Sequence, residues 1–334
     1  MTRNIYDVYL DKIITLKVPG GKFLKSRSVN GGHTGFVYEV DVKLNLKIYK
    51  FIVKLSKIIG AWSLKEERPE QRVYGGRSRS FENVYKLLIN NKIPTFKLLS
   101  YGLPTKEVPY FYQVLSRLEG FSIREHLTLS NCANKNNLLK LSGTELGKLH
   151  LITRSYDGWV GQKKPYTIKW KDSFLKALDI RLHHFLKSNY LSLQQKQELI
   201  FFIKEKKRKW TNPKEYVLSH VDGLQGMAEY RNKKWIFSGH IDLEDYRFTD
   251  QRFVLAGLEI GSNYSIKDAP RDFWEGYLKF KKVDRSFHVL KDLFKLFYFM
   301  SWIQMTDKST ENIKLSSKIN KGYVDKIILI TNIK

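Results

Sequence analysis

Residues 219–250, SHVDGLQGMAEYRNKKWIFSGHIDLEDYRFTD, place a histidine and an aspartate on a short loop, then an apolar hairpin, then an acidic cluster. The loop carries His220 and Asp222, and the cluster begins with Asp242 at the end of the strand-like WIFSGHID. Phosphoryl transfer needs one carboxylate to orient or deprotonate the attacking hydroxyl, and further oxygen ligands to hold Mg²⁺ against the phosphates. Asp222 suits the first task and Asp242 the second. The alternative interpretation is that these three side chains are ordinary cap and turn residues.

The composition is that of a globular protein with a strong positive charge. A chain of 334 residues with 42% hydrophobic residues is long enough for two lobes or domains. The formal net charge of +26 would attract any polyanion, including nucleic acid, an anionic membrane surface or a phosphorylated small molecule. Because the basic residues are spread along the whole chain, we ascribe them to a genome-wide bias, and a nucleic-acid partner is an alternative that we do not favour.

The sequence predicts a cytoplasmic protein without a membrane span. Cys132 is the only cysteine, so no intrachain disulfide is expected and a reducing compartment is the natural one. Asp7 and Asp11 interrupt the N-terminal region where a signal peptide would need an apolar run. The most apolar C-terminal run, LFKLFYFMSWIQM, contains Lys295 and is too short to cross a bilayer.

The hydrophobic pattern changes along the chain from strand-like to helical. FVYEVDV and LKIYKFIVKLS alternate apolar and polar residues, and LNLK between them is short enough for a hairpin turn. SFENVYKLLINNKIP has helical spacing, and after residue 120 helical patterns dominate, as in KDSFLKALDIRLHHFL and SLQQKQELIFFIKEKKRKW. We therefore expect an α+β protein with a β-rich lobe over residues 1–118 and a mostly helical lobe over residues 119–334. Residues 306–334 are polar and basic, and their pattern assigns no element.

Three features of the β-rich region follow one another in the order found in protein kinases. Gly31 and Gly32 lie between two expected strands, where small residues let backbone N–H groups approach phosphate oxygens. Lys54 lies inside the apolar strand YKFIVKLS, and Glu82 lies on the helix that follows. In protein kinases such a lysine pairs with nucleotide phosphates and with a glutamate of the next helix. Each feature alone is common in proteins that bind no nucleotide.

The whole set of motifs resembles the aminoglycoside phosphotransferase and choline kinase group of small-molecule kinases. The resemblance covers about residues 20–280 and rests on the GG loop, IVKL, FENVYKLL, LSRLEG, LGKLH, LSHVDG and HIDLED. It implies a two-lobed, protein-kinase-like fold with ATP or GTP between the lobes. It also implies that backbone near Ser116 and Leu118 binds the base, and that Lys54, supported by Glu82, holds the phosphates.

For the catalytic loop, the resemblance implies that Asp222 is the catalytic base and that His220 shapes the loop. The family places an asparagine ligand for Mg²⁺ five residues after this aspartate, where this chain has Met227. Counting back from Asp242 by the length of one hairpin gives Glu229 as the substitute ligand.

Further candidate ligands lie on either side of the hairpin. Gln225 is the alternative to Glu229, and Glu244 with Asp245 would complete a second metal site or contact a cationic substrate. Val254 stands where the family often has an aspartate that braces the catalytic loop, and Asp250 is a candidate replacement.

The function implied by this resemblance is ATP-dependent transfer of the γ-phosphate to a hydroxyl of a small molecule, assisted by Mg²⁺. The basic chain favours a neutral or anionic acceptor over a cationic one. Because Met227 replaces the asparagine, the alternative is a kinase-like pseudoenzyme that binds nucleotide or a polyanion such as nucleic acid without phosphoryl transfer.

Overall fold

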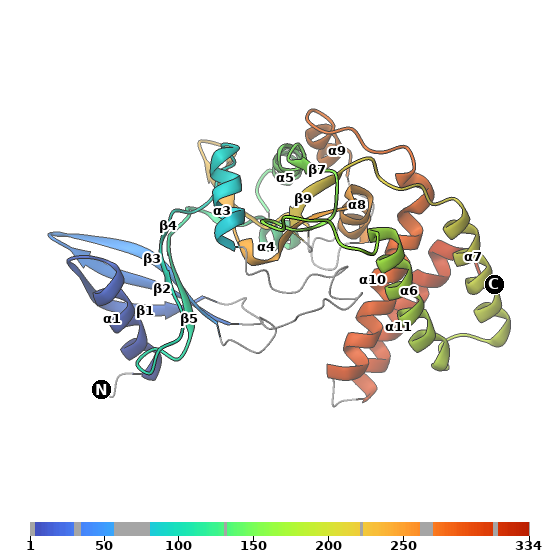
Figure 1. The fold of residues 1–334 in the computed structure, drawn as a ribbon, viewed down its shortest axis with the longest axis horizontal. Coiled ribbons are helices and arrows are strands. Elements are labelled where there is room, and N and C mark those ends of the chain that lie inside the picture. The colour runs from blue at the N-terminus through green and yellow to red at the C-terminus, as the bar shows by residue number, and fades with distance from the viewer. Residues whose placement is uncertain are drawn as a thin grey trace.

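A sheet-containing lobe and a helical lobe lie beside each other in the computed structural model (Figure 1). The structure describes residues 4–29, 35–56, 81–129, 132–220, 223–260, 270–309 and 313–333. This arrangement confirms the expected α+β, two-lobed fold. Within these described ranges, no helix combines the length and the apolar character that crossing a bilayer requires.

The first lobe is built on a five-stranded antiparallel sheet with the order β1-β2-β3-β5-β4. One face of β2 buries Tyr38, Val40 and Val42 against the preceding helix, as its period-two alternation requires. The opposite face presents Lys54 and Gln113, which lie directly across from each other on β3 and β5. The strands are β1 (Gly21–Ser28), β2 (Gly35–Leu44), β3 (Lys47–Ser56), β4 (Leu98–Gly102) and β5 (Phe111–Ser116).

Two helices flank this sheet. Helix α1 (Ile5–Lys17) was not predicted, and it buries Leu10, Ile13 and Ile14 on the sheet. Helix α3 (Phe81–Asn90) confirms the helical pattern of FENVYKLLIN and buries Phe81, Val84 and Leu88 on one side.

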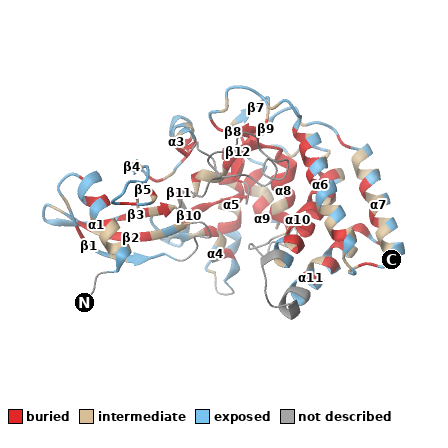
Figure 2. Cartoon of the chain, turned by 60° about the horizontal axis from the view of Figure 1, so that its bottom comes forward, coloured by how far each residue is buried: buried red, intermediate tan, exposed pale blue. Residues whose placement is uncertain are grey.

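The second lobe packs its helices around an aromatic core. Trp170 and Phe174 of α6 lie against Trp210, Phe253 and Phe294, with neighbouring ring centroids about 5 to 6 Å apart. Figure 2 shows the buried residues concentrated where these helices meet. The helices are α4 (Ile123–Thr128), α5 (Lys135–Leu149), α6 (Trp170–Lys187), α7 (Leu193–Arg208), α8 (Gln251–Ile260), α9 (Arg271–Tyr277), α10 (Phe287–Ser309) and α11 (Ile313–Thr331). In the described part of residues 306–334, which the sequence left without an element, the structure therefore has the end of α10 and the whole of α11.

Two small sheets position the ends of the decisive stretch. The hairpin expected from the sequence is present, with a two-residue turn at Asn232 and Lys233 that both have positive φ. Its strands are β10 (Gly226–Arg231) and β11 (Lys234–His240), and β10 also pairs with β6 (Phe121–Ser122). The other sheet has the order β7-β9-β12-β8, formed by β7 (Thr153–Arg154), β9 (Tyr216–His220), β12 (Tyr246–Thr249) and β8 (Gly158–Trp159).

The linker between the lobes is pressed against the hairpin at Gly120. This residue has φ +90°, and a Cβ atom there would lie 2.1 Å from the carbonyl oxygen of Ala228. Only glycine meets both conditions. Immediately before it, Arg117 donates to Glu39 of β2 at 2.7 Å and to Glu119 at 2.8 Å.

Candidate active site

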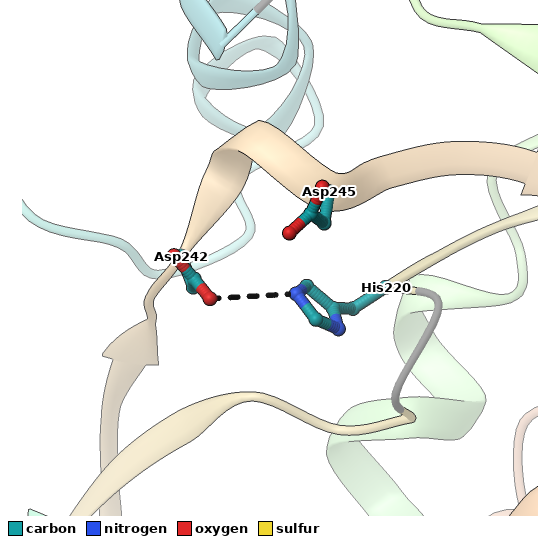
Figure 3. A group of neighbouring side chains, drawn as sticks. All are labelled: His220, Asp242 and Asp245. Atoms are coloured by element: carbon teal, nitrogen blue, oxygen red, sulfur yellow. Dashed lines mark ion pairs between the residues drawn. The ribbon is translucent and has the colours of Figure 1, made fainter. Parts of the chain in front are cut away.

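His220, Asp242 and Asp245 converge where three elements of the helical lobe end (Figure 3). His220 closes β9, Asp242 follows β11, and Asp245 ends the short 3₁₀ helix η2 (Leu243–Asp245). One ligand atom from each side chain lies within 4.8 Å of the others, and Nε2 of His220 lies 3.7 Å from Oδ2 of Asp242. The Asp242 and Asp245 carboxylates are hard oxygen ligands that fit the Mg²⁺ expected from the sequence. The imidazole of His220 suits softer metals, so we assign it to supporting Asp242 instead.

Asp242 adopts the left-handed backbone conformation, with φ 57° and ψ 48°. This conformation is uncommon outside glycine, although aspartate and asparagine tolerate it better than most residues. It turns the chain from β11 into η2 and leaves the Asp242 side chain 44% exposed beside the buried His220. The carboxylate is thus held in place and still accessible to a ligand.

Lys54 joins the two lobes at this carboxylate. Its Nζ donates to Oδ1 of Asp242 at 2.6 Å and to Oε1 of Glu244 at 2.9 Å. Burial alone would lower the pKa of the Lys54 ammonium, but the Glu244 and Asp242 carboxylates raise it above its ordinary value. Burial would likewise raise the pKa of Asp242, and Lys54 with His220 instead holds it far below its usual range. Both groups are therefore charged at neutral pH.

Gln113 is a member of the site that sequence reasoning missed. Its Nε2 donates to the same Oε1 of Glu244 at 2.9 Å, from the position on β5 directly across from Lys54. Its side chain is buried, so the hydrogen bond satisfies an amide that would otherwise be costly. The available signal was a single amide residue inside the apolar strand YFYQVL.

The expected pairing of Lys54 with Glu82 is wrong. Glu82 accepts from Tyr101 Oη at 2.8 Å and pairs with Lys86, one helical turn away, at 2.7 Å. Glu244 instead accepts from Lys54, because η2 follows directly after Asp242 and carries Glu244 to the same side of the ammonium.

The two candidate replacements for the missing asparagine lie in different places. Glu229 lies on β10 across from Ile236, which is six residues before Asp242 along β11. At about 3.3 Å per residue this separates Glu229 from Asp242 by roughly 15 to 20 Å, so its expected role as a metal ligand is wrong. Gln225 lies beside the site, since its carbonyl accepts from the amide of Ile241, the residue before Asp242. Met227 is inside β10 and pairs with Gly239.

The two residues expected to contact the base lie at the start of the linker. Ser116 ends β5, and both its amide and its Oγ are bonded to the backbone of Lys97. Leu118 follows it and packs partly buried against the main core. The base-binding role of both residues stays a prediction.

Some expected site residues lie outside the described residues. Asp222, Gly31 and Gly32 belong to this group.

Asp250, the candidate replacement for the bracing aspartate, is described and is fully buried, and its carboxylate accepts from Arg252 at 2.6 Å. It therefore braces the start of α8.

Comparison with known proteins bears on the fold. No protein-family model and no curated protein matches the sequence. Among solved structures, the chain matches a spectinomycin phosphotransferase in complex with ADP and spectinomycin, with a TM-score of 0.60 and 12% identity over 97% of this chain and 96% of that chain. The fold of the present chain is therefore that of the aminoglycoside phosphotransferases.

Two further structures with the phosphotransferase fold match over similar lengths. One is a thermostable mutant of an aminoglycoside phosphotransferase in a ternary complex with AMP-PNP and hygromycin B, with a TM-score of 0.59 and 12% identity over 96% of this chain and 98% of that chain. The other is a candidate fructosamine-3-kinase from Haemophilus somnus, with a TM-score of 0.55 and 11% identity over 96% of both chains.

Proposed function

We propose that the chain is a small-molecule kinase that transfers the γ-phosphate of ATP or GTP to a hydroxyl group. The observation that carries the proposal is the contact of Lys54 in the sheet lobe with Asp242 and Glu244 in the helical lobe, within the phosphotransferase fold. A strand lysine beside a half-exposed aspartate is the pair that phosphoryl transfer uses to hold phosphates and a cation.

Each side chain has a separate task in this mechanism. Lys54 exchanges Asp242 for the nucleotide phosphates, and Glu244, itself held by Gln113, keeps the ammonium aimed at them. Asp242 and Asp245 would hold Mg²⁺, with Gln225 beside them as the amide that replaces the missing asparagine. When bound, Mg²⁺ supplies positive charge that neutralises the transferring phosphoryl group.

Asp222 would act as the catalytic base, two residues beyond the fixed His220. It accepts the proton of the acceptor hydroxyl while the hydroxyl oxygen attacks the γ-phosphorus, and the nucleoside diphosphate leaves. His220 is buried and its Nε2 lies 3.7 Å from Asp242, so it would fix the point at which the chain leaves β9 toward Asp222. The net charge of +26 favours a neutral or anionic acceptor, and the single cysteine suits a cytoplasmic location.

The test is Mg²⁺-dependent hydrolysis of ATP and GTP by the purified protein, with thermal unfolding measured at increasing nucleotide concentration. We expect Asp222→Asn and Asp242→Asn to lower turnover at least about 100-fold, because each removes charge needed in the transition state. Gln225→Ala should weaken the Mg²⁺ dependence. Glu229→Gln is the matched control and should leave turnover unchanged, since Glu229 lies far along the hairpin.

Two outcomes would contradict the proposal. Nucleotide-induced stabilisation without turnover would favour the pseudoenzyme alternative, for which Met227 in the asparagine position is the supporting observation. No effect of nucleotide on thermal unfolding would exclude both interpretations.

A further inference from the structure

The turn between β2 and β3 exposes large apolar side chains far from the candidate active site. Leu46 in the turn is 95% exposed and Ile48 on β3 is 62% exposed. Leu16 at the end of α1 is 64% exposed, and α1 leads through a short connection to Gly21, which pairs with Leu44 beside the turn. We call residues 43–50, together with Leu16, Lys17 and Lys22, the basic–apolar tip.

The fold itself does not require these apolar residues. Strand β3 pairs with β5 only from Phe51 onward, so residues 47–50 extend past β5 and pair only with β2, which is itself paired with β1 at this end. This hairpin reaches the end of the molecule opposite the helical lobe (Figure 1). Two-residue hairpin turns favour asparagine, aspartate and glycine, and Asn45 takes the positive φ here, yet the next residue is a leucine.

The positions of the lysines in the tip destabilise the sheet. Lys22 on β1 lies directly across from Lys43 on β2, and like charges in that position destabilise a sheet. Lys17 and Lys47 lie at the same end, and the sequence has no acidic residue from Val42 to Lys65. An anionic partner would remove this repulsion.

We propose that the basic–apolar tip docks onto an anionic lipid surface. Leu46, Ile48 and Leu16 enter the boundary between headgroups and acyl chains, while the lysines contact lipid phosphates. The most exposed apolar side chains of the tip, Leu46, Leu16 and Ile48, are aliphatic, and Tyr49 is the aromatic one at 45% exposure. This mixture fits the headgroup boundary of a membrane better than single-stranded nucleic acid, whose bases stack on several aromatic rings.

Docking at this end leaves the candidate active site open. Ile48 precedes Lys54 by six residues on the same strand, a distance of roughly 20 Å. The proposal therefore stands independently of the proposed kinase activity, and the part of the chain that the structure describes would reach the membrane without a helix that spans it.

The experiment is co-sedimentation of the full chain with vesicles of phosphatidylcholine alone or with added phosphatidylglycerol. We expect binding only to the anionic vesicles, released by raising the salt to about 0.5 M because the charges are then screened. Leu46→Asp should weaken binding about tenfold or more. Leu329→Asp is the matched control, since Leu329 is 74% exposed on α11 in the other lobe, and it should bind like the wild type.

A second variant separates docking from folding. Lys43→Glu replaces the like-charge pair with an attractive one, so thermal stability should rise while vesicle binding falls several-fold. Equal sedimentation with neutral and anionic vesicles, or unchanged binding by Leu46→Asp, would overturn the proposal. Binding to duplex DNA that competes with vesicles and is insensitive to Leu46→Asp would also overturn it, because charge alone would then explain the interaction.

Discussion

Two acid–base pairs with the same closest distance, 2.6 Å, have opposite surroundings in this molecule. Asp250 and Arg252 are two residues apart in the sequence, and both side chains are almost completely buried. Asp242 and Lys54 are 188 residues apart, come from different lobes, and are 44% and 21% exposed.

The difference separates a structural ion pair from a functional one. Arg252 makes three contacts with the Asp250 carboxylate and also donates to Ser286 and Thr211, so its hydrogen-bonding capacity is largely used within the fold. The Asp242 carboxylate, in contrast, is partly accessible to solvent. Lys54 can therefore move to another anion without leaving Asp242 as a buried, unpaired charge. Proximity of opposite charges alone would not have distinguished the two pairs.

The largest expected effect tests the buried pair. Arg252→Met leaves the Asp250 carboxylate buried without its cation, which should lower the free energy of unfolding by about 3–5 kcal/mol. Urea denaturation measures this directly. A loss below about 1 kcal/mol would show that the fold does not depend on this buried pair.

The equivalent change in the other pair should give a different result. Lys54→Met should lower the free energy of unfolding by less than Arg252→Met does, because Asp242 is 44% exposed to solvent and Glu244 keeps its hydrogen bond from Gln113. Nucleotide affinity should fall tenfold to a hundredfold, since hydrogen bonds to charged groups are worth about 1.5–3 kcal/mol. Thermal unfolding at increasing nucleotide concentration measures both the stability and the affinity. A large loss of stability with unchanged affinity would show that Lys54–Asp242 is a structural pair like Arg252–Asp250.

A smaller effect concerns two buried histidines of the helical lobe and the pH dependence of stability. Burial lowers the pKa of His150 to about 3 from an ordinary 6.5, with Lys281 adding to the shift, and burial also lowers that of His240 to about 3. Below pH 6.5 the unfolded chain therefore binds protons that the folded chain does not. The free energy of unfolding should fall by about 1.4 kcal/mol per pH unit for each imidazole as the pH decreases.

The control for this pH dependence is His150→Gln, which keeps a polar group facing Tyr277 Oη. The free energy of unfolding, measured by urea denaturation at pH 7, 6 and 5, should depend less steeply on pH in the variant than in the wild type. The difference between the two slopes should equal the contribution of one imidazole. Identical slopes would mean that His150 is not neutral in the folded state.

The smallest expected effect concerns Glu82. Because its partners are Lys86 and Tyr101 on the surface, Glu82→Gln should change the free energy of unfolding by less than about 0.5 kcal/mol and leave nucleotide affinity unchanged. If the variant lost nucleotide affinity, the result would support the kinase-type contact between Glu82 and Lys54, which the structure contradicts.

Most of the fold could be predicted because its elements carry strong local patterns. The alternation in FVYEVDV and LKIYKFIVKLS predicted β2 and β3, and the helical spacing predicted α3, α6 and α7. Helix α11 was missed because its IILI run has no clear period until it packs on α10, where Val324 and Ile327 become buried.

The candidate site was predicted less completely, since its geometry depends on register. Counting residues led to Glu229, whereas the bulge after Met227 and the cross-strand pairing keep Gln225 beside Asp242. The link from Lys54 and Gln113 to Glu244 joins residues more than 130 positions apart, and no local pattern encodes it.

Gly120 determines where the two lobes can turn relative to each other. Because the backbone there contacts Ala228, and Phe121 and Ser122 pair with β10, the chain from Gly120 onward moves with the helical lobe. Thr95, just before β4, is held to the helical lobe as well, through its hydrogen bond to the carbonyl of His240. A rotation between the lobes must therefore be absorbed on both sides of β4 and β5, after Thr95 and at residues 117–119, next to the expected base-binding backbone.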